Sequence, residues 1–151
     1  MSTIAAIAPE PLSVDRLLGG RKVLHSQPRT PLDWVGLIRH GISSTAIDVL
    51  SKTLQLTQGE LASALAIPER TLARRKKEGT LSSEESAKVV RLARVVERAE
   101  EVFEDLGAAL DWLKSPNAAL GGDTPLSLID TDIGTQSVMD TLGRIEHGVY
   151  G

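Results

Sequence analysis

The stretch from Thr57 to Lys77, TQGELASALAIPERTLARRKK, places the strongest constraint on the fold of this chain. Thr57 and Glu60 have the spacing of a capping box, in which the threonine oxygen accepts from the amide of Glu60 and the glutamate carboxylate accepts from the amide of Thr57. A helix is therefore expected to begin here, and a second, basic helix follows after only a few residues. The residues predicted to pack the two together are Leu61, Ala62, Leu65, Ile67 and Leu72. Two short helices at this separation are typical of a helix-turn-helix.

The second helix is expected to present a basic stripe to solvent. At about 100° per residue, Arg74 and Lys77 fall within roughly 40° of Arg70, and Leu72 lies on the far side. Arg70 and Arg74 are candidates for guanine edges. Glu69 suits a cytosine amino group and Thr71 a thymine methyl, whereas Arg75 and Lys77 are expected to contact phosphates. The predicted DNA-binding residues are Thr57, Gln58, Glu69, Arg70, Thr71, Arg74, Arg75 and Lys77. The alternative is a solvated basic helix that never meets DNA.

The turn between these two helices contains Ala66, where this motif usually has glycine. If the backbone there needs a positive φ, alanine costs on the order of 1 kcal/mol. A folded domain tolerates a cost of that size, so the prediction of a helix-turn-helix stands.

The rest of the chain also carries helix signals. Only 3% of its 151 residues are aromatic, so the core is expected to consist of Leu, Ile, Val and Ala, a composition that favours packed helices. Capping and periodicity predict helices over 30–41, from 44, from 82 to about 104, over 105–114 and over 132–147. No alternating β pattern appears, and we predict an all-α fold.

The helix that starts at Thr30 is expected to face inward through Leu32, Val35 and either Leu37 or Ile38. Together with the helix from Ser44, it would buttress the helix-turn-helix or supply the surface on which two copies of the chain meet. A homodimer is expected, because one short helix reads few bases and paired half-sites are how this motif gains affinity.

Several kinds of chemistry are excluded or disfavoured. The chain has no cysteine, which removes disulfides, thiol catalysis and thiolate metal sites. His25, His40 and His147 are too far apart in sequence to suggest a metal site, and no titratable pair at catalytic spacing stands out. We therefore expect no catalytic residue, no metal and no cofactor. No apolar run reaches the roughly 20 residues of a membrane span, and the protein is expected to be cytoplasmic.

Charge is distributed unevenly along the chain. Residues 99–151 carry two basic and ten acidic side chains, whereas residues 55–98 carry nine basic and six acidic ones. An acidic third cannot lie along DNA, which favours a second partner at that end. A solvated acidic surface that only aids solubility explains the charge equally well.

Three motifs in the acidic third carry a family resemblance. They are AALDWL at 108–113, PNAALGGDTPL at 116–126 and LGRIEHGVY at 142–150. In this order and spacing they resemble the toxin-binding domain of Xre/MbcA/ParS antitoxins, over roughly residues 99–151. The helix-turn-helix upstream resembles the Xre-like half of the same family, from which Ala66 is the main departure.

The resemblance implies a Cro/Xre-like helix-turn-helix domain followed by a small helical toxin-binding domain. The boundaries we predict are an N-terminal arm at 1–29, the helix-turn-helix region with its buttressing or dimerisation helices at 30–80, a connecting helix at 81–104 and the toxin-binding domain at 105–151. The arm is expected to be mobile or loosely docked.

The function implied by the resemblance is that of an antitoxin. Its partners would be a RES-domain toxin that consumes NAD, encoded by the neighbouring gene, and the operator DNA of its own promoter, bound by a homodimer within a toxin-antitoxin hetero-oligomer. The C-terminal segment would occlude the toxin's active site. The residues that would contact the toxin are Arg144, Glu146, His147, Gly148, Val149 and Tyr150.

Each contact residue also has a structural alternative, such as Arg144 pairing with Asp140 or Tyr150 folding back on Leu142. At the level of the whole chain, the alternative is a stand-alone helix-turn-helix transcriptional regulator whose acidic domain dimerises or senses a ligand. An enzyme in its own right would have to turn over NAD alone.

Overall fold

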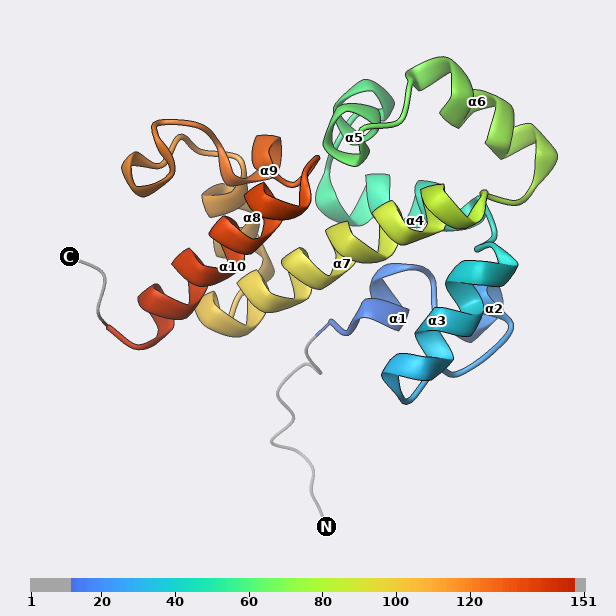
Figure 1. Cartoon of the computed structure of the whole chain (residues 1–151), viewed down its shortest axis with the longest axis horizontal. Coiled ribbons are helices and arrows are strands. Elements are labelled where there is room, and N and C mark those ends of the chain that lie inside the picture. Colours follow the sequence, from blue (N-terminus) through green and yellow to red (C-terminus); the bar gives the residue numbers. More distant parts are fainter. Residues whose placement is uncertain (1–11, 149–151) are drawn as a thin grey trace, which may run out of the picture.

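The computed structural model describes residues 12–148, and these are organised entirely around helices (Figure 1). The elements are α1 (Val14–Leu17), α2 (Arg21–Leu24), α3 (Pro31–His40), α4 (Thr45–Leu54), α5 (Gln58–Leu65), α6 (Glu69–Glu78), α7 (Ser83–Phe103), α8 (Leu106–Leu113), the 3-10 turn η1 (Ala118–Leu120), α9 (Pro125–Leu128) and α10 (Asp132–Glu146). Within these residues an isolated antiparallel bridge joins Ser43 to Thr80, and no strand forms. The predicted all-α fold is confirmed. Across 12–148, no helix combines the length and apolarity needed to cross a membrane.

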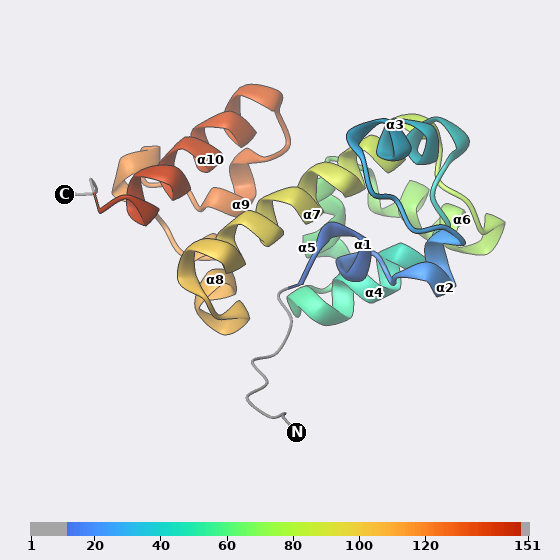
Figure 2. The same cartoon turned by 90° about the horizontal axis from the view of Figure 1, so that it is seen from below.

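The long helix α7 lies at the centre of the molecule. It contacts α1, α3 and α5 along one half and α8 and α10 along the other, as two views at right angles show (Figures 1 and 2). Its buried apolar residues are Val89, Val90, Leu92, Ala93, Val95, Val96 and Ala99. All of them belong to one apolar cluster that extends from α1 to α10. The helix predicted to connect two parts is therefore the middle of a core that both parts share.

Residues 12–24 also belong to this core, although the sequence assigned them to an N-terminal arm. The backbone N–H of Leu12 donates to Glu100 Oε1 (2.7 Å). The N–H of Val14 donates to Glu97 Oε2 (3.0 Å), and burial raises the pKa of that glutamate. This segment is tied to α7 through its backbone, and only residues 1–11 of the predicted arm lie outside the described residues.

Three capping boxes begin α3, α5 and α7, formed by Thr30 with Asp33, Thr57 with Glu60 and Ser82 with Glu85. In α5, Thr57 Oγ1 accepts from the Glu60 N–H (3.1 Å) and Glu60 Oε1 accepts from the Thr57 N–H (2.8 Å). The helix starts that depend on local sequence are therefore found where the capping residues predict them.

The predicted inward face of α3 is wrong for Leu32 and Val35 and is confirmed for Ile38. Leu32 is 79% exposed and Val35 37% exposed, whereas Trp34 and Ile38 are half-buried and pack against the core. The apolar residues of α3 lie almost all the way around the helix, so the sequence pattern does not define which side faces inward.

The helix-turn-helix forms as predicted, with α5 and α6 in contact around Leu61, Leu65 and Leu72, each at most 2% exposed. Ala66 ends α5 with φ 55°, in the left-handed region that favours glycine. Its carbonyl oxygen accepts from Lys88 Nζ of α7 (2.9 Å). The tight turn is therefore fixed by the central helix despite the unfavourable backbone conformation of the alanine.

Replacing this alanine should stabilise the protein. In Ala66→Gly the left-handed strain is removed, partly offset by the larger entropy of glycine in the unfolded chain, and we expect a gain of about 0.5–1 kcal/mol in the free energy of unfolding. Chemical denaturation measures this gain. Ala73→Gly, at an exposed position with ordinary helical geometry in α6, is the matched control and should cost about 1 kcal/mol. A loss of stability in both variants would contradict the assignment of strain to Ala66.

Candidate functional site

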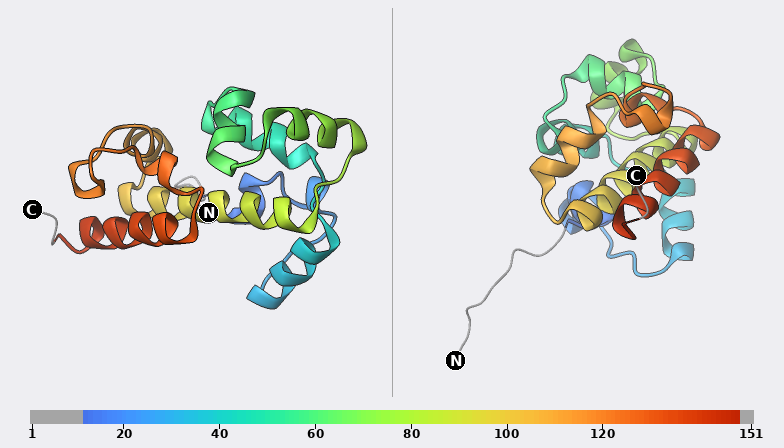
Figure 3. Two further views of the ribbon diagram at one scale, coloured as in Figure 1. Left: turned by 45° about the horizontal axis from the view of Figure 1, so that its top comes forward. Right: turned by 90° about the vertical axis from the view of Figure 1, so that its left-hand side faces the viewer.

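The outward face of α6 is basic. Arg70, Arg74 and Lys77 are exposed, and Leu72 on the opposite side is fully buried. Figure 1 shows α6 on the outside of the molecule, and in the left-hand view of Figure 3 no other helix crosses in front of it. The side chain of Arg74 lies 3.8 Å from Glu78 and remains 57% exposed. The expected basic stripe is thus present and faces solvent.

Four of the predicted DNA-binding residues come together at the start of α6. Glu69, Arg70, Thr71 and Arg74 line one shallow surface hollow together with Pro68. A glutamate and two arginines so placed present one acceptor and a set of donors, the groups that distinguish base edges in a major groove. This hollow and the exposed Lys77 form the candidate DNA-reading surface.

Arg75, which the sequence assigned to phosphate contact, lines an adjoining hollow with Thr71 and Arg74 and is held by two carboxylates. Its Nε donates to Glu85 Oε1 (2.8 Å) and its Nη1 to Glu78 Oε1 (2.8 Å). These hydrogen bonds raise the pKa of Arg75 above its already high value. Because Glu85 also caps α7, Arg75 fastens α6 to the central helix.

Two further predicted residues are engaged in contacts within the chain. Gln58 Oε1 accepts from Lys76 Nζ (3.0 Å), which also pairs with Asp48 Oδ1 of α4 (2.8 Å). The hydroxyl of Thr57 is used in its cap. Lys76 therefore joins α4, α5 and α6, a bracing role that its place in a run of basic residues did not indicate.

The last turn of α10 is anchored to α7 by Arg98, a residue that the sequence pattern did not indicate as functional. Arg98 Nη2 donates to Glu146 Oε1 (2.6 Å) and Nη1 donates to Glu146 Oε2 (3.0 Å). Arg98 also contacts Glu101 one turn further along α7 (2.8 Å). Glu146, predicted as a toxin contact, is thus held by a two-point ion pair at the end of its helix. A partner 48 positions away in sequence leaves no local signal.

The other predicted contact residues at this end are exposed. Arg144 donates to Thr141 Oγ1 (3.2 Å), whereas Asp140 accepts from Gln136 (2.9 Å), so the alternative pairing of Arg144 with Asp140 is not found. His147 and Gly148 follow α10 at the surface, and Gly148 has φ 70°.

Val149 and Tyr150 lie outside the described residues, and so does the alternative contact between Tyr150 and Leu142.

The loop at 116–126 has a structural role. Asn117, which is 7% exposed, accepts from the Ala119 N–H with its side chain (2.8 Å) and from the Gly122 N–H with its carbonyl (2.9 Å). Thr124 then caps α9 by accepting from the Ser127 N–H (3.2 Å). These bonds fix the connection that leads into α10.

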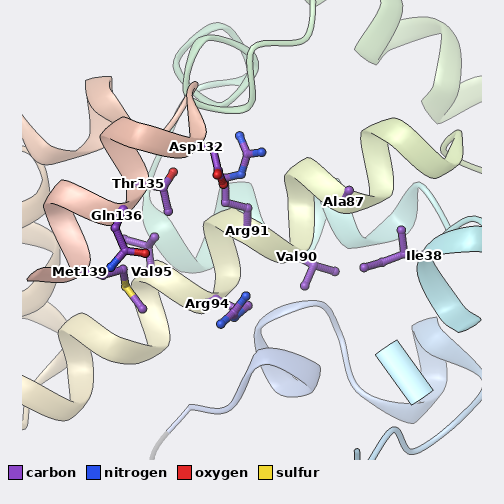
Figure 4. A pocket seen from close by; sticks show the side chains of 10 residues that line it. All are labelled: Ile38, Ala87, Val90, Arg91, Arg94, Val95, Asp132, Thr135, Gln136 and Met139. Carbon is purple, nitrogen blue, oxygen red and sulfur yellow. The ribbon is translucent and has the colours of Figure 1, made fainter. Parts of the chain in front are cut away.

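A groove of about 490 Å³ separates α3 from α10 above the central helix (Figure 4). Its lining is mixed, with apolar side chains such as Val90 and Met139 beside Arg91, Arg94 and a single carboxylate, Asp132. Arg91, one of the lining residues, donates to the Ile129 carbonyl (3.4 Å).

An exposed basic helix after a tight turn, on a core shared with a second helical part, defines a helix-turn-helix protein with an appended domain. Residues 33–94 match the Antitoxin Xre-like helix-turn-helix domain, and residues 98–148 match the Antitoxin Xre/MbcA/ParS C-terminal toxin-binding domain. The chain belongs to the Xre antitoxin family. The resemblance inferred from the three C-terminal motifs is confirmed.

The relatives found match most of the chain. An Antitoxin Xre of Yersinia enterocolitica is 35% identical over 147 residues, 96% of this chain and 98% of that protein. An Antitoxin Xre of Photorhabdus laumondii is 32% identical over 115 residues, 75% of this chain and 78% of that protein. A protein named Prs ADP-ribosylating antitoxin, from a Sphingobium species, is 28% identical over 131 residues, 80% of this chain and 82% of that protein.

The anchor between α7 and α10 can be tested in the isolated protein. We expect Arg98→Ala to leave the core folded but to lower the hydrogen-exchange protection of the His147 and Gly148 amides several-fold, since these donate to the carbonyls of Gly143 and Ile145 in the anchored turn. Arg94→Ala, an exposed arginine on the same helix, is the matched control and should leave the protection unchanged. Equal losses in both variants would show that the ion pair does not hold the turn.

The same anchor should depend on pH. The hydrogen bonds from Arg98 lower the pKa of Glu146, so the unfolded chain binds the proton more readily than the folded one. The stabilisation is present at neutral pH and is lost as the pH falls through the lowered pKa, below the ordinary range of a glutamate. Protection of the last turn should decline there in the wild type. If it declined equally in Arg98→Ala, another group would be responsible.

Proposed function

We propose that this chain is the antitoxin of a type II toxin-antitoxin pair and that it neutralises a RES-domain toxin that degrades NAD. The toxin would be encoded by the neighbouring gene. The residues that follow α10 would occlude its active site, and the helix-turn-helix would bind the operator of the shared promoter as a homodimer. Neutralisation is steric and needs no catalysis by the antitoxin.

The observation that carries the proposal is the anchored end of α10. A two-point ion pair fixes Glu146, and Arg144 and His147 beside it are exposed. A short segment that continues from a fixed helix end can enter a cleft at little entropic cost, because its base is already ordered. Tyr150, four residues beyond Glu146, would add apolar area with a polar tip.

Charge supports the same partner. The acidic side chains gathered in residues 99–151 would complement a basic cleft that holds the phosphates of NAD. Arg144 would bind a carboxylate of the toxin. The relative named Prs ADP-ribosylating antitoxin is associated by its name with ADP-ribosylation, a reaction that uses NAD as donor. This supports an NAD-consuming toxin as the partner.

For the DNA-binding half, the support is the hollow at the start of α6. Arg70 and Arg74 would contact guanine edges, Glu69 a cytosine and Thr71 a thymine methyl, with Lys77 on a phosphate. Arg75 and Gln58 would hold α6 in place rather than contact DNA, since both are engaged within the chain. Both partners would be met in the cytoplasm.

The division of roles on α6 predicts different losses for different variants. Arg70→Ala or Arg74→Ala should each cost about 1–3 kcal/mol of operator binding and relax base choice, because a bidentate contact to guanine is lost. Lys77→Ala should weaken operator and random DNA equally and reduce the salt slope by about 1. Lys52→Ala, an exposed lysine of α4, is the matched control, and titrations at several salt concentrations measure all four variants. Equal losses on both DNAs for all three α6 variants would contradict the division.

Removal of the C-terminal segment tests neutralisation. Deleting Val149 to Gly151 leaves α10, its anchor and Gly148 intact, and we expect the shortened chain to fail to protect cells from NAD loss while it keeps its operator affinity. NAD levels and co-purification with the neighbouring gene product are the measurements. Tyr150→Phe, which keeps the ring and removes the hydroxyl, separates apolar filling from hydrogen bonding.

Two outcomes would count against this proposal. A shortened chain that still protects cells would show that the segment is not the inhibitory element. A full-length chain that retains no neighbouring gene product would favour a stand-alone transcriptional regulator.

A further inference from the structure

The helix α3 leaves an apolar stripe without a partner. None of its residues is fully buried, and of the three exposed large hydrophobic side chains in the described residues, Leu32 and Val35 belong to α3. Leu32, Val35, Gly36 and Arg39 have the spacing i, i+3, i+4 and i+7 and therefore share one face. The half-buried Trp34 and Ile38 face the core from the other side. The stripe is a surface that the fold does not use.

We propose that this stripe is the surface on which two copies of the chain pair, α3 against α3 in antiparallel orientation about a two-fold axis near Gly36. The inference rests on the proposal that the protein acts as a homodimer, and it names the contact that holds the two copies together. Residue i of one copy then meets residue j of the other and the reverse, as a two-fold interface requires.

Gly36 supports a close approach from outside. A Cβ added there would meet no atom within 4 Å in this chain, so packing within the protein does not require glycine. Glycine in the middle of a helix is less favourable than alanine. A second helix that crosses at this position would explain the glycine, because the missing side chain lets the two backbones approach closely.

Charge supports an identical helix as the occupant. Asp33 lies in the first turn of α3, and Arg39 and His40 lie in the last turn. Antiparallel pairing sets the acidic start of each helix beside the basic end of the other, and it also opposes the two helix dipoles favourably. Within the stripe, Val35 of each copy lies next to the axis, and Leu32 packs along the aliphatic part of Arg39 of the second copy.

The position of α3 is compatible with the other surfaces. In the left-hand view of Figure 3, α3 lies on the opposite side of α7 from α6, and the end of α10 is farther away still. Pairing through α3 therefore covers neither the DNA-reading surface nor the anchored C-terminal turn. A single pair of ten-residue helices is smaller than a standard interface, so we expect a dimer that dissociates at micromolar concentrations.

The experiment uses the full chain. Sedimentation equilibrium over a range of concentrations should show a dimer that Leu32→Lys weakens at least tenfold, because the lysine lies opposite the basic end of the other α3. Gly36→Leu should weaken it as well while raising the helix propensity of α3, which separates loss of pairing from loss of folding. Ile133→Lys is the matched control, since Ile133 is 82% exposed but lies on α10, and it should leave the dimer intact. Circular dichroism checks that every variant is folded.

Cysteine cross-linking provides a direct test because the natural chain has no cysteine. Val35→Cys should form a disulfide-linked dimer under mild oxidation, and Ile133→Cys should not. A chain that stays monomeric at all concentrations would overturn the homodimer itself. A dimer that survives both Leu32→Lys and Gly36→Leu would overturn only the α3 interface, and loss of co-purification with the toxin in Leu32→Lys would assign the stripe to the toxin instead.

Discussion

Burial of α7 is the constraint on which the rest of the structure depends. The helix has 21 residues, a length of about 30 Å, and its aliphatic side chains are buried along both halves. Each buried valine or leucine contributes about 1.5–3 kcal/mol relative to exposure. Because one apolar cluster joins the helices on either half, neither part can leave α7 without exposing buried side chains of that cluster. The two family domains are thus parts of one core.

Polar contacts from α7 fix the working ends of the molecule. Lys88 holds the carbonyl of the helix-turn-helix turn, Glu85 receives Arg75 of α6, and Arg98 holds the last residue of α10. Pairs that remain partly exposed, such as that of Arg98, typically contribute about 1 kcal/mol or less. Their role here is to fix positions, since each joins a segment of the candidate site to a helix that is buried in the core.

Helix starts, the buried pair of the helix-turn-helix and the basic stripe were all predictable because their causes are local. A capping box is complete within four residues, and the far side of α6 follows from the position of Leu72. The sequence also marked Ala66 as the position where a positive φ would be unfavourable, and the structure gives that residue a φ of 55°.

Contacts between distant residues were not predictable. Glu97 binds the backbone of Val14 across 83 positions, and Arg98 binds Glu146 across 48, and no spacing in the sequence marks either pair. The prediction of which side of α3 faces inward was partly wrong for a different reason. Its apolar residues surround the helix, and which of them are buried was decided by what α7 offers as a packing surface. The predicted role of Arg75 depended in the same way on Glu85, a residue of another helix.

Rigidity of the shared core also limits how the two ends can influence each other. The DNA-reading surface on α6 and the end of α10 lie at opposite ends of the long axis (Figure 1). Communication between them by a hinge would require α7 to bend or to lose contacts on one half, at the cost of several buried aliphatic side chains. Two copies joined in one assembly, as proposed above, would change operator affinity without any such movement, because a second reading helix raises the effective concentration at the neighbouring half-site. In this fold, therefore, any effect of a bound toxin on DNA binding is expected to act through the number and arrangement of copies in the assembly rather than through a change of shape within one chain.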